Sequence, residues 1–115
     1  MSILSERISA NRAEKDRKNI EVEEWGEGNS PLLIYYGAVT GRDIDRVQRK
    51  HPDFLANPTI AAMVEMIILK AEDDQGEKLF TIEDKQVLLN EPVSLIGNIF
   101  GTVFNADSVE EQEKN

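Results

Sequence analysis

The chain has 115 residues, of which 40% are hydrophobic and 30% are charged, and its formal net charge is −9. This length fits one domain, and the apolar fraction is high enough for a folded core. The negative charge repels phosphate and argues against a conventional nucleic-acid binder. Because the chain has no cysteine, disulfides and thiolate metal sites are excluded, which fits a reducing compartment such as the cytoplasm.

Charge and apolar residues divide the chain into three parts. Residues 1–18 are highly charged and unlike a signal peptide, and we expect at most a partial helix there. Residues 19–105 hold the apolar segments and should form a single globular domain. Residues 106–115 are acidic and almost without apolar anchors, so we expect a disordered tail. No apolar stretch is long enough to cross a membrane.

The first predicted element is a β-hairpin. Residues 19–24 alternate between apolar and charged side chains, and residues 32–36 form a strand-like apolar run. The segment between them, residues 25–31, is rich in turn-forming residues, so the hairpin should have a long loop. Together with the helices that follow, this predicts an α+β fold that is mainly helical.

Cap signals set the starts of about four helices. Thr40 and Asp43 have the spacing of a capping box, and Pro52 should end that helix near His51. Asn57 followed by Pro58 has the pattern of a second helix start. A second capping-box pattern precedes a short third helix, and a proline begins the last one. We therefore expect helices over residues 40–51, 58–72, 81–89 and 90–104.

The second of these helices is the most informative segment, because it is apolar nearly all round. One side carries Ile60, Val64, Ile67 and Ile68, and Glu65 stands alone between the two apolar sides. A central core helix explains this pattern, and so does a methionine-bearing side that packs against another chain. On the second interpretation, the candidate partner-binding residues are Ala62, Met63, Met66 and Leu69, followed by Trp25 of the predicted hairpin loop.

No residue pattern indicates catalysis, a metal or a cofactor. His51 is the only histidine, and its place at a helix end favours a surface cap over a catalytic role. Residues 73–77 fail the spacing of a calcium loop, and residues 26–28 lack the third glycine of a dinucleotide loop. Paired glutamates lie in polar runs typical of solvated surface. We therefore expect a protein that is not an enzyme.

Three motifs occur in a characteristic order: residues 22–26 before a strand, residues 40–43 after it, and residues 74–84 later in the chain. They read Val-Glu-Glu-Trp-Gly, Thr-Gly-Arg-Asp and Asp-Gln-Gly-Glu-Lys-Leu-Phe-Thr-Ile-Glu-Asp. In this order and spacing, residues 19–104 resemble the tail assembly chaperone family of long-tailed bacteriophages and prophages. One departure is Gly37-Ala38, where many members of the family have a basic residue.

The resemblance implies a non-enzymatic helper that binds the tape measure protein and the tail tube subunits in the cytoplasm of the bacterial host. It also implies self-association and absence from the mature virion, and no nucleic-acid or membrane partner. An alternative is an acidic phage-encoded inhibitor, or DNA mimic, that binds a host protein. That alternative calls for a regular array of carboxylates, whereas here they are mixed with Lys and Arg along the first two thirds of the chain.

Overall fold

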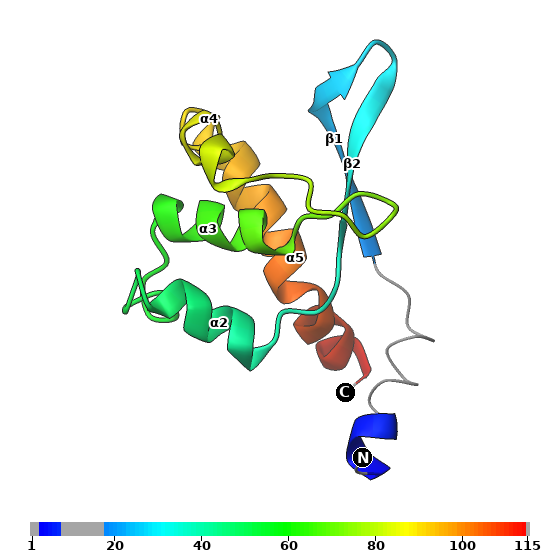
Figure 1. Cartoon of the computed structure of the whole chain (residues 1–115), viewed down its shortest axis with the longest axis vertical. Coiled ribbons are helices and arrows are strands. Elements are labelled where there is room, and N and C mark those ends of the chain that lie inside the picture. Colours follow the sequence, from blue (N-terminus) through cyan, green and yellow to red (C-terminus); the bar gives the residue numbers. More distant parts are fainter. Residues whose placement is uncertain (1–2, 8–17, 115) are drawn as a thin grey trace.

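The computed structural model of the chain describes residues 3–7 and 18–114, with side chains up to Phe104. Residues 3–7 form a helical turn, as expected for part of the N-terminal segment, and residues 8–17 lie outside the described residues. A two-stranded antiparallel hairpin and a group of helices follow (Figure 1). The α+β fold with an N-terminal hairpin is therefore confirmed.

The hairpin is tighter than predicted. Strands β1 (Lys18–Glu27) and β2 (Ser30–Tyr36) pair antiparallel and are joined by a two-residue turn that contains Gly28, with φ at +57°. At Gly26 a Cβ atom would lie 2.1 Å from the carbonyl oxygen of Ser30, so only glycine lets the strands approach there. The prediction of a long loop was wrong, because these glycines let both strands continue almost to the turn.

The segment after helix α3 (Ile60–Lys70) extends the sheet beyond β2. Tyr35 exchanges two backbone hydrogen bonds of 2.9 Å with Glu72, which also forms a bridge with Lys78. The helix therefore ends at Lys70 and not near Glu72 as predicted, because the backbone of Glu72 pairs with β2. This pairing ties the helical part of the molecule to the hairpin.

Helix α3 is the centre of the helical part, and the other helices pack against it. In Figure 1 it lies between α2 and α4, and α5 crosses it. A short 3-10 helix, η1, leads directly into α4. The bounds of these elements are α2 (Gly41–Gln48), η1 (Ile82–Asp84), α4 (Lys85–Leu89) and α5 (Val93–Lys114).

The starts of α2 and α3 test the capping residues that the sequence predicted. The capping box of α2 is confirmed, since the Thr40 hydroxyl accepts from the Asp43 backbone N–H at 3.2 Å and the Asp43 carboxylate accepts from the Thr40 N–H at 2.9 Å. Helix α3 begins two residues later than predicted, because Thr59 and not Asn57 supplies the cap. The Thr59 hydroxyl accepts from the Ala62 N–H at 3.2 Å.

Helix α5 extends beyond its predicted end. The sequence predicted a disordered tail from Ala106, but the helical backbone continues to Lys114. No proline or glycine interrupts residues 102–114, and glutamate, glutamine and lysine within them are good helix formers. The loss of apolar residues therefore does not mark the end of the helix.

The core lies where β2, α3 and α5 meet. Ile34, Met66, Ile67, Ile96 and Ile99 are at most 1% exposed and come from all three elements. Each such side chain contributes about 1.5–3 kcal/mol to folding when it leaves water. Three phenylalanines extend this core, with ring centroids 5.1 to 5.9 Å apart: Phe54, Phe100 and Phe104.

Candidate partner-binding surface

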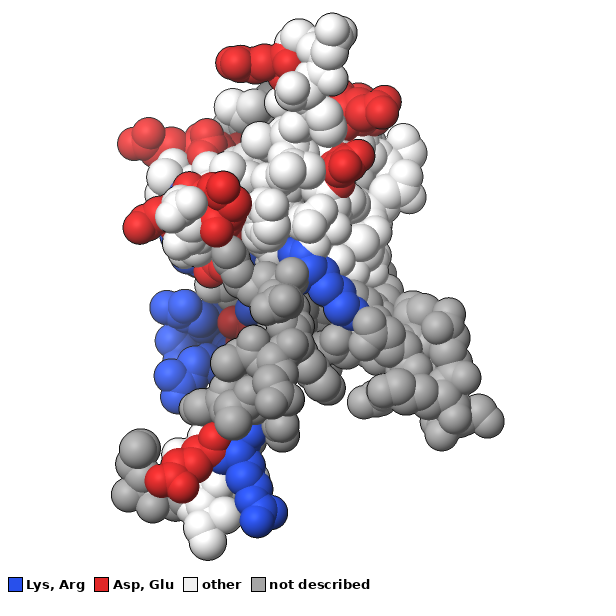
Figure 2. Space-filling view, turned by 90° about the vertical axis from the view of Figure 1, so that its right-hand side faces the viewer, with Lys and Arg blue, Asp and Glu red and all other residues white. Residues whose placement is uncertain are grey.

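Charge is unevenly distributed over the surface. Strand β1 carries four exposed glutamates, whereas the exposed side of α2 is basic. In Figure 2 most acidic side chains lie on the upper part of the molecule and basic ones at mid-height and below. Residues that are mixed along the sequence are therefore separated in space. The exposed charges of the two elements are Glu21, Glu23, Glu24 and Glu27 on β1, and Arg42, Asp45, Arg46 and Arg49 on α2 and its C-terminal cap.

The methionine-bearing side of α3 does not form a surface. Ala62 and Met66 are 0% exposed, so the prediction that they contact a partner is wrong for this structure. The physical reason is that several elements enclose α3 and use both of its apolar sides for the core. Met63 and Leu69 are partly buried and pack against the edge of the core, with part of each side chain still accessible.

Trp25 anchors the hairpin to the rest of the molecule. Its indole N–H donates a hydrogen bond to the carboxylate of Glu91, which lies between α4 and α5. The ring also meets Phe80 edge to face, with centroids 5.9 Å apart and an angle of 88° between the planes. Trp25 is half-buried, so its internal contacts leave only part of the ring for a partner.

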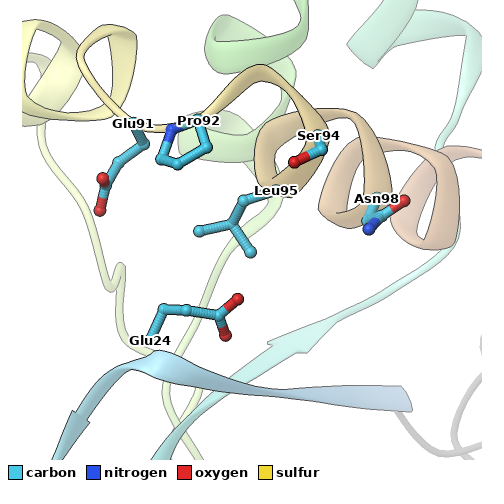
Figure 3. A pocket seen from close by; sticks show the side chains of 6 residues that line it. All are labelled: Glu24, Glu91, Pro92, Ser94, Leu95 and Asn98. Atoms are coloured by element: carbon cyan, nitrogen blue, oxygen red, sulfur yellow. The ribbon is translucent and has the colours of Figure 1, made fainter.

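A pocket of about 340 Å³ opens beside this anchor, between β1 and the start of α5. Figure 3 shows Leu95 pointing from α5 toward Glu24 of β1, with Glu91 at one end of the row and Asn98 at the other. The volume is at the small end of the range for ligand sites, about 300–1,000 Å³. The pocket thus combines an apolar floor with two carboxylates, and it is lined by Glu24, Glu91, Pro92, Ser94, Leu95 and Asn98.

Exposed apolar side chains occur in the segment that leads from η1 through α4 to the start of α5. Val93, which stands between two residues that line it, is 64% exposed, and Val87 of α4 and Ile82 of η1 are 65% and 60% exposed. Single exposed apolar residues are common on protein surfaces, but here three fall within one short segment. We call these three residues the α4 surface. Sequence reasoning missed it because Ile82 lies within a capping-box pattern and Val87 begins a short apolar run, and neither pattern shows which side chains stay exposed.

Two carboxylates elsewhere have lowered pKa values, and both serve the fold. Burial raises the pKa of Asp43, but the hydrogen bond from the Thr40 backbone and the contact with Lys70 outweigh it, so the net pKa is lowered. Burial likewise raises the pKa of Glu65, and the hydrogen bond and charge of Lys85 reverse the effect. Both groups are held ionised in ion pairs, so neither has the raised pKa of a general acid.

His51 differs from its predicted role as a surface cap. Its side chain is partly buried, and its Nε2 atom is enclosed without a hydrogen-bond partner among the described residues. Within the described part of the chain, no group of three or more histidine, aspartate or glutamate side chains could hold a metal ion. In the same part, no helix combines the length and the apolar character that crossing a membrane requires.

Comparison with known proteins finds no relative of this chain. The chain matches no protein-family model, no curated protein and no solved structure. A functional argument therefore rests on the residues of this chain and their arrangement.

Proposed function

We propose that this protein is a tail assembly chaperone of a long-tailed phage or prophage. It binds the tape measure protein and the tail tube subunits in the bacterial cytoplasm, carries out no reaction, and leaves before the virion is finished. The order of the motifs in residues 22–26, 40–43 and 74–84 supports this proposal. The geometry adds a surface suited to protein binding.

The observation that carries the proposal is the α4 surface, of which Val93 stands between two residues that line the pocket. Exposed Val87 and Val93 offer apolar contact area, and Glu24 and Glu91 line the pocket at the start of α5. A partner segment with apolar and basic residues would satisfy both features. The stem of a lysine or arginine would lie over Leu95, and its charged end would meet the carboxylates.

The direct test measures binding of the purified chain to the tape measure protein encoded in the same genome. Val87→Lys should reduce binding by at least tenfold, because the charge would lose its water in the complex. Gln86→Lys adds the same charge to the neighbouring exposed position of α4 and is the matched control. Both chains should keep the wild-type circular dichroism spectrum. Absence of binding by the wild-type chain, or equal binding by both variants, would refute the proposal.

The acidic inhibitor is a second candidate, favoured by the four exposed glutamates of β1. A protein of this kind presents carboxylates at the positions where its target binds the phosphates of DNA. It should therefore compete with DNA for a host DNA-binding protein, and the competition should weaken as salt is added. Binding to the tape measure protein without any competition against DNA would favour the chaperone.

A further inference from the structure

Helix α2 presents a stripe of arginines that the proposed function does not use. Arg42, Arg46 and Arg49 are all exposed, and their spacing of four and three residues places them on one side of the helix. Val47 points the other way, into the core. Among the described residues none forms an ion pair with these arginines. The stripe therefore carries three positive charges, bordered by exposed Asp45, on a chain whose net charge is −9.

The lysines near α2 behave differently, because the fold uses their charges. Lys70 lies 3.0 Å from Asp43, Lys85 lies 2.7 Å from Glu65, and Lys50 lies 3.8 Å from the same Glu65 oxygen. These pairs connect helices within the chain. The three arginines make no such connection, which leaves them available for a partner.

The outer face of the hairpin has the complementary charge. Glu21 and Glu23 flank the buried Val22, so strand alternation turns both of them away from the helices. Leu33 lies directly across from Glu21 in the strand register and is 37% exposed. Half-buried Tyr35 follows on the same side of β2. The outer face therefore has an apolar centre beside two exposed carboxylates.

The distance between neighbouring charges is similar in the two charged sets. Arg42 and Arg46 are separated by about 6 Å along a helix, and Glu21 and Glu23 by about 6.7 Å along a strand. Within one chain the two sets lie apart, because α5 runs between α2 and the hairpin (Figure 1). Each set is therefore complementary in charge to the other set on a second copy of the chain.

We propose that the arginine stripe of α2 docks on the outer face of the hairpin of a second copy. Arg42 and Arg46 pair with Glu21 and Glu23 of the neighbour, and the arginine stems cover its Leu33. The contact is head to tail, since each copy offers one set of each kind, so it builds a chain or closes into a ring. It uses neither the pocket nor the α4 surface, so its test is independent of the test for tape measure binding.

Such a contact should be weak and sensitive to salt, because exposed ion pairs are individually weak and are screened by ions. Sedimentation velocity at low ionic strength should show association in the submillimolar range. At about 1 M salt, where the Debye length falls to about 3 Å, the chain should be monomeric.

Charge reversal gives a test that identifies both surfaces. The double variant Arg42→Glu with Arg46→Glu, and the double variant Glu21→Arg with Glu23→Arg, should each be monomeric alone, because each brings like charges together. An equimolar mixture should associate with the two variants alternating, since the arginine stripe of the second variant meets the acidic hairpin of the first, and the reversed stripe of the first meets the reversed hairpin of the second. A chain with all four reversals should associate again. Because all four positions are exposed, every variant should fold, and circular dichroism can confirm this.

The result that would overturn the proposal is equally specific. A wild-type chain that remains monomeric at low salt, or variants that associate alone as the wild type does, would exclude the contact. Failure of the mixture to associate would show that the two surfaces do not recognise each other.

Discussion

Lys85 at the start of α4 donates a 2.7 Å hydrogen bond to the carboxylate of Glu65 in the middle of α3. Glu65 is the one charged residue within the apolar run of that helix, and its side chain is only 15% exposed. The pair explains how an otherwise apolar helix tolerates a carboxylate. It also fixes the position of the short helix α4, which has few buried residues of its own.

Breaking this pair should destabilise the protein through loss of a specific contact. Lys85→Ala and Glu65→Ala should show a coupling free energy of about 1 kcal/mol in a double-mutant cycle measured by urea unfolding. Lys50→Ala is the control, because Lys50 is 63% exposed and lies 3.8 Å from Glu65; its coupling should be near zero. Additive effects of the first two changes would contradict a direct interaction.

Acid should weaken the fold through the same carboxylate. The pKa of Glu65 in the folded chain lies below its ordinary value of 4.5, and that of Asp43 below 3.8. The unfolded chain therefore binds these protons first as the pH falls. The stabilisation that these carboxylates give is complete at pH values above their ordinary pKa values. It is lost as the pH falls through the lowered pKa values of the folded chain. Glu65→Gln should flatten the acid side of the curve of unfolding free energy against pH, and an unchanged slope would contradict this assignment.

The two methionines of α3 should respond differently to charge. Met66 is 0% exposed, so Met66→Glu should bury an unpaired carboxylate at a cost of several kcal/mol, comparable with the stability of a small domain. The chain should unfold. Met63 is only partly buried, and Met63→Glu should leave a cooperative melting curve. Met66→Leu, which conserves volume, should change the free energy of unfolding by less than about 1.5 kcal/mol. A folded Met66→Glu protein would contradict the packing of α3.

Local sequence signals predicted the elements well, because each depends on neighbours in the chain. The capping box at Thr40 needs only Asp43, three residues away, and the hairpin follows from two nearby apolar runs. The turn length was missed because it depends on a close approach at Gly26 that no pattern records. The start of α3 was missed because Thr59 and Asn57 are both good caps, and only the packing of the helix selects one.

The candidate surface could not be read from the sequence, since it depends on distant residues. Glu24 and Glu91 line one pocket although 67 positions separate them in the numbering. The burial of Met66 likewise depends on how other helices cover α3. The spacing of apolar residues within one helix gives no information about its neighbours. The sequence could show that α3 has two apolar sides, but not that both face the core.

The hydrogen bond between Trp25 and Glu91 should control how firmly the hairpin is held against the helices. Trp25 is the only tryptophan, so tryptophan fluorescence reports the surroundings of this one side chain. Glu91→Ala removes the acceptor of the indole N–H, and we expect emission at longer wavelength and a loss of about 1 kcal/mol in the free energy of unfolding. Glu91→Gln keeps an acceptor oxygen and should give a much smaller spectral shift. Glu24→Ala, on the opposite side of the pocket, should leave the spectrum unchanged. If Glu91→Gln and Glu91→Ala shift the emission equally, the hydrogen bond does not hold Trp25 in place, and the edge-to-face contact with Phe80 must do so.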